Sequence, residues 1–135
     1  MSLLELRRAT QKDSKFLTKL EGTSQSNWLR KELKRQDISM FIAFDTKLSQ
    51  PVGWAQIDHD GCVDELRWAV APWCRKQGFG RKIAEKLVTL TINPIVIATI
   101  KNTNFASEKL AKSIGMEPVG EDYRGYVVWR KNGKQ

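Results

Sequence analysis

Two periodicities of apolar residues divide this chain into strands and helices. Alternating or short continuous apolar runs are typical of β-strands, whereas repeats every three or four residues predict amphipathic helices. Strands are expected at 3–9, 40–44, 52–58, 62–70, 95–100, after 116 and around 126–129, and helices at 14–22, from 26, at 78–91 and at 104–115. This order of elements predicts one α/β domain spanning residues 1–135.

Two polar motifs mark the starts of the first helices. Thr10 and Asp13 have the spacing of a capping box. Ser26 is expected to cap a second short helix, with Trp28 and Leu33 on its apolar face. The opposite face is basic, and we interpret it either as a solvated surface or as a docking surface for an acidic or nucleic-acid partner.

The most informative stretch joins an apolar strand to a helix through a short basic loop. The run Leu66–Val70 stops before Pro72, and an amphipathic segment begins at Phe79. Glycines in the loop let the backbone approach a ligand, and the unpaired N–H groups at a helix start attract anions. The sequence therefore predicts a phosphate cradle on the backbone of residues 76–81.

The chain after this helix completes a crossover. Asn93-Pro94 ends the helix, and the continuous β-prone run Ile95–Ile100 is typical of a strand buried on both faces. A strand, a helix and a second strand make a right-handed crossover, so the strands at 62–70 and 95–100 are expected to be parallel.

The loop matches neither the dinucleotide-binding fingerprint nor the P-loop. It reads Arg75-x-x-Gly78-x-Gly80, preceded by Val70-x-Pro72. This pattern resembles the acetyl-CoA motif of the GNAT N-acetyltransferase superfamily, which is Gln/Arg-x-x-Gly-x-Gly/Ala after a strand ending in Val-x-Pro. The alternative interpretation is a tight strand-to-helix turn that binds no ligand.

The last helix resembles the same superfamily. Its pattern there is Asn-x-x-Ala/Ser-x-x-Leu-Tyr-x-x-x-Gly, and Asn104, Ser107, Leu110 and Gly115 match it. The tyrosine position is Ala111, which is a departure from the pattern. The opening strand, threonine cap and helix are also similar, so the resemblance covers nearly the whole chain.

The resemblance implies a fold and an activity. The fold is a mixed α/β sheet, mostly antiparallel, with a parallel pair splayed at the acetyl-CoA site and about four flanking helices. The activity is direct transfer of an acetyl group from acetyl-CoA to a primary amine in a ternary complex. The residues implied to bind the cosubstrate are Trp68, Ala69, Val70, Arg75, Lys76, Gln77, Gly78, Phe79, Gly80, Arg81 and Asn104.

The resemblance also suggests how the amine is activated. A carboxylate eleven residues before the motif is the general base in some members, and Asp64 holds that position. Glu65 is the alternative if the strand contains a bulge, and a chain of waters is a third. A backbone N–H at Ala69 or Val70 is implied to stabilise the oxyanion.

The general acid is the weakest part of the match. The tyrosine that protonates the leaving thiolate in the superfamily is absent at Ala111. Ser107 lies one turn earlier on the same helix face, and Tyr123 and Tyr126 in the last strands are further candidates. This departure predicts a slower enzyme or an acid from elsewhere, and it supports the alternative of a degenerate acyl-CoA-binding sensor or partner protein without turnover.

Net charge and cysteine content bear on the possible partners, metal binding and cellular compartment. The net charge of +8 attracts polyanions, and the phosphates of CoA account for part of it. A basic nucleic-acid-binding module, which could act on tRNA, is therefore a third alternative, although no such motif is present. Cys62 and Cys74 lack the spacing of a zinc site or a disulfide framework, which predicts no metal and reduced thiols in the cytoplasm.

The remaining expectations concern small details and partners. His59 stands between two aspartates at 58–61, a stretch that we interpret as a surface turn. No apolar run approaches the length of a membrane span, so no membrane partner is expected. The acceptor is predicted to be a small-molecule or protein amine, and the chain a monomer or homodimer.

Overall fold

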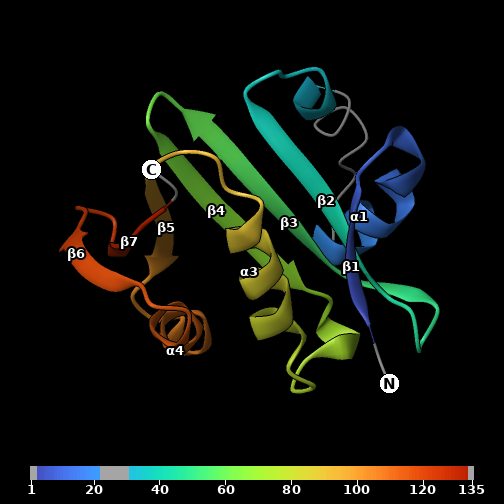
Figure 1. Cartoon of the computed structure of the whole chain (residues 1–135). Helices are drawn as coiled ribbons and strands as arrows, with labels where there is room; N and C mark the ends of the chain where they lie inside the picture. The colour runs from blue at the N-terminus through green and yellow to red at the C-terminus, as the bar shows by residue number, and fades with distance from the viewer. Residues whose placement is uncertain (1–2, 22–30, 134–135) are drawn as a thin grey trace.

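Seven strands form one mixed sheet in the order β1-β2-β3-β4-β5-β7-β6 (Figure 1). The computed structural model describes residues 3–21 and 31–133. All neighbouring strands are antiparallel except β4 and β5, which are parallel as the crossover predicted. The strands are β1 Leu4–Arg8, β2 Ile38–Asp45, β3 Gln50–Asp60, β4 Val63–Val70, β5 Ile95–Lys101, β6 Glu117–Glu121 and β7 Tyr126–Asn132.

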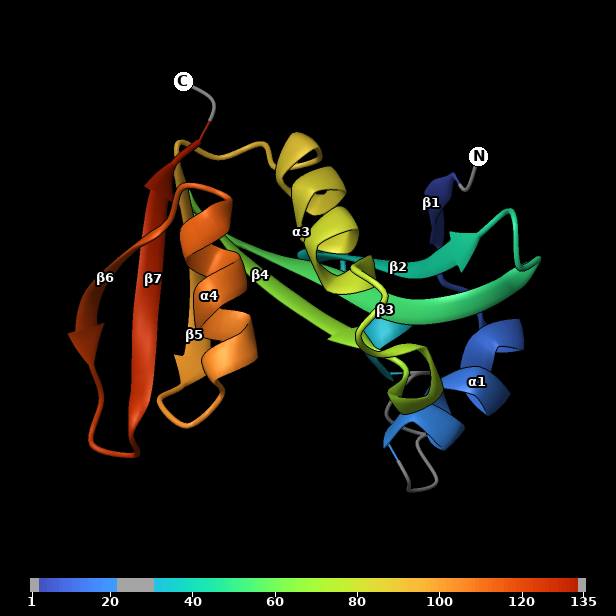
Figure 2. The ribbon, with the colours of Figure 1, turned by 90° about the horizontal axis from the view of Figure 1, so that it is seen from below.

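The helices cover both faces of this sheet. Helices α3 and α4 lie over one face and α1 lies over the other (Figure 2). Their bounds are α1 Ser14–Glu21, α3 Phe79–Thr89 and α4 Phe105–Ser113, with short 3-10 turns η1 Gln11–Asp13 and η2 Pro72–Cys74. No helix in the described part of the chain is long and apolar enough to cross a membrane.

Each helix buries an apolar face on the sheet. Phe79, Ile83 and Leu87 of α3 are buried in the larger core, as their spacing predicted. On the other face, Leu17 of α1 packs into a smaller core with Trp54 of β3. The sheet is thus the middle layer between two separate apolar cores.

The predicted helix N-caps are confirmed where they fall in the described residues. Thr10 and Asp13 form the capping box, in which the Thr10 N–H donates to Asp13 Oδ2 at 2.8 Å. Asn104 caps α4, with its Oδ1 accepting from the Ser107 N–H at 3.2 Å. The predicted cap of the second short helix, Ser26, lies outside the described residues.

Two sequence-based expectations about the strands were wrong. Strand β5 is not buried on both faces, because only its alternate residues Val96, Ala98 and Ile100 are buried. The stretch 58–61 is not wholly a turn, since β3 continues through Asp60 and the chain turns at Gly61. His59 therefore belongs to a strand, where its neighbours in space come from other strands.

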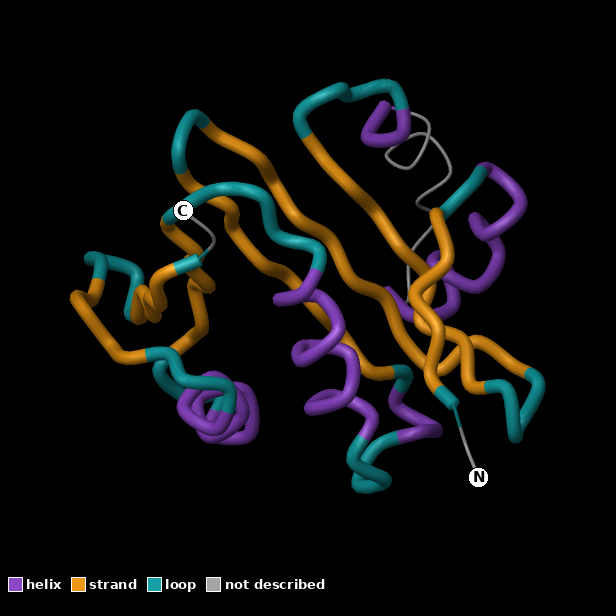
Figure 3. The backbone as a smooth tube through the Cα atoms, in the orientation of Figure 1, coloured by secondary structure: helices purple, strands orange, loops and turns teal. Residues whose placement is uncertain are grey.

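Strands β4 and β5 separate soon after they meet. They pair at only three positions, of which the last is Glu65 opposite Ile97. Beyond that point β4 pairs with β3 alone, while β5 pairs with β7 along its whole length. The backbone trace shows the two strands diverging (Figure 3). A sheet edge without a partner is thereby exposed in the middle of the fold.

The start of this parallel pair is held by one buried carboxylate. Asp64 is fully buried and accepts hydrogen bonds from the N–H groups of Ile92 and Asn93, at 2.7 and 3.1 Å. Asn93 Nδ2 and His59 Nδ1 donate to its other oxygen, at 2.7 and 2.6 Å. Ser39 Oγ in turn lies 3.0 Å from His59 Nε2. One side chain thus links β2, β3, β4 and the turn before β5.

These hydrogen bonds also set the charge of Asp64. Burial by itself would raise its pKa, but the donors on His59, Ile92 and Asn93 outweigh burial and hold the pKa below the ordinary carboxyl value. A lowered pKa in the folded state means that ionised Asp64 stabilises the fold above the pKa of the unfolded chain, about 4. This contribution is lost as the pH falls through the folded-state pKa.

We expect Asp64→Asn to lower the free energy of unfolding by about 3 kcal/mol at neutral pH, because the amide cannot accept all four donors. Urea unfolding followed by tryptophan fluorescence measures this. The difference between wild type and variant should shrink as the pH falls below about 4. Asp60→Asn, at an exposed position of the same hairpin, is the control. A difference that does not change with pH would contradict the assignment.

Candidate functional site

A groove of about 660 Å³ lies between the end of β4, the loop before α3 and the first turns of α4. It opens where β4 and β5 have diverged. All of the residues predicted to bind the cosubstrate line it, except Gln77 and Arg81. The side chain of Arg81 is instead directed along α3, where its Nε donates to Glu85 Oε1 at 2.7 Å.

The loop before α3 has the backbone shape of an anion cradle. Lys76 and Gly78 both adopt positive φ, at 64° and 80°. A Cβ on Gly78 would meet no atom within 4 Å, so glycine is required there by its φ and not by crowding. The first turn of α3 closes with a hydrogen bond from the Lys82 N–H to Gly78 O. The N–H groups of 79–81 precede that bond and are available to an anion.

The unpaired edge of β4 presents the backbone of its even-numbered residues. The Ala71 N–H donates to Val52 O in β3, and Cys62 O accepts from the Ile95 N–H at the start of β5. The β3–β4 register has no shift, so odd positions face β3 and even positions face β5. The N–H and C=O groups of Trp68 and Val70 therefore point into the gap, whereas those of Ala69 point to β3.

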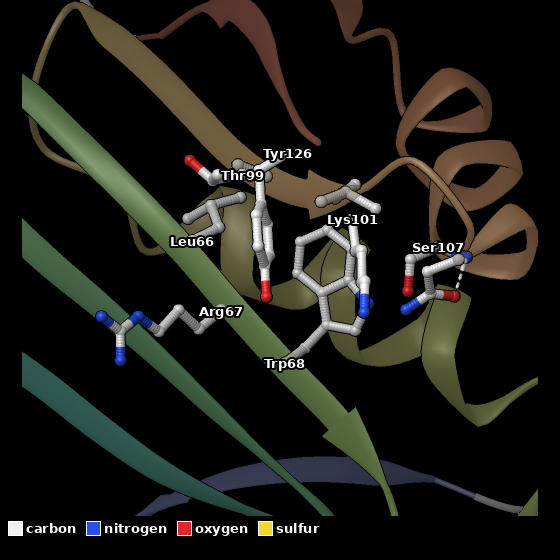
Figure 4. A pocket seen from close by; sticks show the side chains of 10 residues that line it. Leu66, Arg67, Trp68, Thr99, Lys101, Ser107 and Tyr126 are labelled. Carbon is white, nitrogen blue, oxygen red and sulfur yellow. Dashed lines mark hydrogen bonds between the residues drawn. The ribbon is translucent and has the colours of Figure 1, made fainter. Parts of the chain in front are cut away.

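A second cavity, of about 280 Å³, continues the opening between β4 and β5 (Figure 4). Three consecutive residues of β4 line it, namely Leu66, Arg67 and Trp68. Consecutive residues border it, so this cavity follows the edge of β4. A ligand bound along that edge can thus extend from the groove into it.

Two of the predicted catalytic side chains reach this second cavity. Tyr126, at the start of β7, points its hydroxyl into the cavity beside the Trp68 ring (Figure 4). Ser107 lines both cavities from the first turn of α4. Tyr123 is 97% exposed, in the turn between β6 and β7, and lines neither cavity.

The two carboxylates on β4 lie in different surroundings. Asp64 is sealed at the start of β4 by the four donors described above, at the end of the strand opposite to the cradle. This geometry argues against Asp64 as the general base. Glu65 is half-buried at the last paired position before the strands separate. Burial raises its pKa, partly offset by Arg67 and reinforced by Asp58.

Some groove residues were missed by sequence reasoning. Cys74, Ala106 and Leu110 line the groove, although the spacing of the last two indicated only the apolar face of α4. Cys74 is buried, and burial, followed by the charge of Asp45, raises the pKa of its thiol. A neutral thiol is a poor nucleophile, so we assign Cys74 no covalent role and treat it as a lining residue of the groove.

Ala111, at the position of the superfamily's tyrosine, does not line the groove. Ala111 is fully buried in the larger core, and the Met116 N–H donates to its carbonyl at 3.0 Å. The preceding Leu110 is the residue of this turn that lines the groove. The hydroxyl groups that line the gap in the described chain therefore belong to Ser107, Tyr126 and Thr99, and only the first two were predicted as catalytic.

Comparison with solved structures identifies the fold. Spermidine N-acetyltransferase from Vibrio cholerae, in complex with CoA and spermine, matches with a TM-score of 0.80 and 15% identity, over 94% of this chain and 92% of that one. A domain from Methanocaldococcus jannaschii DSM 2661 matches with a TM-score of 0.83 and 14% identity, over 98% and 99%. Both likenesses confirm the predicted mixed α/β fold.

The sequence itself is matched by a family model. No curated protein sequence matches. The model of the acetyltransferase (GNAT) family matches residues 3–116, which include β1, the cradle and α4. The predicted resemblance is confirmed, and with it the expectation of an acetyltransferase that takes acetyl-CoA as cosubstrate. The chain belongs to the GNAT acetyltransferase family.

Proposed function

We propose that this protein transfers the acetyl group of acetyl-CoA to a primary amine, with both substrates bound at once. The observation that carries the proposal is the continuity of the anion cradle, the unpaired edge of β4 and the second cavity along that edge. The cosubstrate enters from the α3–α4 side and the amine from the other. Direct attack is possible because the two meet in the gap.

The cradle and the edge of β4 bind different parts of acetyl-CoA. The pyrophosphate lies on the N–H groups at the start of α3, with Arg75 and Lys76 at the rim of the groove. The pantetheine amides pair with Trp68 and Val70 as an added strand would. Asn104 Oδ1 is used by its own helix cap, so its Nδ2 is the group that reaches the cosubstrate.

The reaction needs a donor for the oxyanion. The backbone parity of β4 favours the Val70 N–H over that of Ala69, because only the even positions face the gap. As the amine nitrogen bonds to the carbonyl carbon, the carbonyl oxygen becomes negative and this N–H stabilises it. Such a donor is typically worth about 3 kcal/mol. The C–S bond then breaks.

Three proton transfers complete the balance. The nitrogen loses one proton before attack and a second as the amide forms, and this second proton restores the group that protonates the departing thiolate. Glu65 accepts the proton of the ammonium, directly or through water, so that the neutral amine can attack. Its raised pKa suits a base that must take a proton near neutral pH. Tyr126 donates a proton to the departing thiolate, since its hydroxyl lies in the gap (Figure 4). Ser107 is the second candidate for this acid.

The acceptor is proposed from chemistry and from the neighbours' names. A structure matched above holds spermine, and a dodecameric form of the same spermidine N-acetyltransferase matches with a TM-score of 0.78 and 17% identity, over 94% and 91% of the two chains. Polyamines are therefore the first amines to screen. A cytoplasmic setting, the oligomeric state and the alternatives of an acyl-CoA sensor or a tRNA-binding module stay predictions.

We expect acetyl-CoA to bind with micromolar affinity in calorimetry. Gly78→Glu should weaken this binding by more than about tenfold, because the new carboxylate enters the anion cradle and the backbone resists a side chain at this φ. Gly61→Glu is the matched control, since Gly61 has a similar φ and open surroundings far from the cradle. Equal affinities of the two variants for acetyl-CoA would contradict the proposed binding of the pyrophosphate at this loop.

We expect Glu65→Gln to lower the turnover number by about 100-fold. In the wild type, kcat should rise with pH through a pKa above the ordinary glutamate value, since the base works when ionised. The variant should lose this acidic limb. A pH profile unchanged in the variant would show that Glu65 is not the base, and a chain of waters would take its place.

We expect Tyr126→Phe to lower the turnover number more than Ser107→Ala does, because the tyrosine hydroxyl lies beside the Trp68 ring at the edge of β4. Both variants should bind acetyl-CoA normally in calorimetry. Steady-state rates with one amine acceptor decide between them. The reverse order of effects would transfer the role to Ser107, and no effect in either would mean that the thiolate leaves unassisted.

A further inference from the structure

The face of β3 and β4 opposite to α3 carries a group of polar side chains. Trp54 and Ala69 mark this face, because both contact the smaller core under α1. Gln56 and Asp58 follow Trp54 at two-residue steps, so they share its face. Asp58 lies opposite Glu65, and Gln56 lies opposite Arg67.

Gln56 is the unusual member of this group. Its side chain is fully buried, yet Oε1 has no hydrogen-bond partner. Its Nε2 donates to Asp58 Oδ1 at 2.6 Å and lies 3.5 Å from Glu32 Oε2, so the amide sits among carboxylates. A buried carbonyl without a donor is costly, so it calls for an explanation, and a donor supplied by a bound ion is one of them.

The charges around Gln56 favour a cation. In the described part of the chain, Arg35 is already paired with Glu32 and Asp37. Arg67 reaches Asp58 only at 3.8 Å, and its charge offsets only part of the effect of burial on the pKa of Glu65. Carboxylates thus exceed guanidinium groups on this face, in a protein whose net charge is +8.

This face borders the second cavity, in which the acetyl group is proposed to lie. The second cavity follows the edge of β4 and includes Arg67 from this face. Figure 4 shows the Arg67 side chain directed away from Trp68 and Tyr126, which leaves the passage between the faces to the acceptor. Gln56 lies opposite Arg67, which is two residues and about 7 Å along β4 from Ala69.

We propose that Gln56 and Asp58 form a subsite for a second cationic nitrogen of the acceptor. Gln56 Oε1 accepts an N–H of this ammonium group, and Asp58 supplies the opposite charge. The acceptor is then a diamine or polyamine whose reacting nitrogen lies in the gap and whose other nitrogen lies about 7 Å along β4, opposite Arg67. The proposal rests on the proposed function, because it extends the acceptor side of the same site.

The test compares spermidine with butylamine, which has no second charge. For wild type we expect the ratio of kcat/KM values to favour spermidine. Gln56→Met keeps the shape of the buried side chain and removes the carbonyl, and Asp58→Asn removes the charge. Each should lower the ratio by about tenfold, mainly through KM for spermidine. Asp60→Asn, exposed on the same strand, is the control for general electrostatics.

Calorimetry of spermidine into the protein with CoA present separates this inference from the proposed activity. Binding that weakens in Gln56→Met or Asp58→Asn supports the subsite even if no amine is acetylated. Transfer to butylamine with no preference for spermidine would overturn the subsite and leave the activity standing. Preference for amino acids, lost in Arg67→Gln, would overturn it in favour of a carboxylate site. Thermal unfolding confirms that each variant is folded, and Asp58→Asn alone suffices if Gln56→Met is not.

Discussion

The buried carboxylate of Asp64 holds the first residues of β4 against the turn that enters β5, and the two strands separate immediately afterwards. It can do so because four donors from β3 and from residues 92–93 converge on its two oxygens. Once β5 has paired with β7 and β4 with β3, nothing in the described chain occupies the edge between them. Backbone polar groups need partners, so this edge is where we propose that an extended ligand pairs.

Basic and acidic side chains lie on opposite sides of the sheet. Basic side chains gather at the loop before α3, where backbone N–H groups already favour an anion. Carboxylates gather on the opposite face of β3 and β4, around the unsatisfied amide of Gln56. An anionic cosubstrate and a cationic acceptor would therefore be drawn to opposite faces of one sheet. The gap beyond Glu65 is the place where the two faces meet.

Much of this arrangement could be predicted because its signals are local. The capping box at Thr10, the glycine at 78 and the cap at Asn104 each act on backbone groups within a few residues. Such contacts depend little on the rest of the chain, so most helix boundaries were predicted correctly, and the loop before α3 has the positive φ at Gly78 that the cradle prediction requires. The errors concern residues whose partners are distant. His59 was read as part of a turn, yet its ring is held by Asp64 and Ser39 from other strands.

By itself the sequence determined the family, the order of strands and helices, and the loop that offers its N–H groups to an anion. Only the tertiary structure decided which of two adjacent carboxylates is buried among hydrogen-bond donors. Asp64 and Glu65 differ by one position on a strand and so point to opposite faces. The donors that occupy Asp64 lie 28 and 29 residues further along the chain, and no local pattern reveals them. The same holds for Gln56, whose unsatisfied oxygen becomes apparent only when the sheet has buried it.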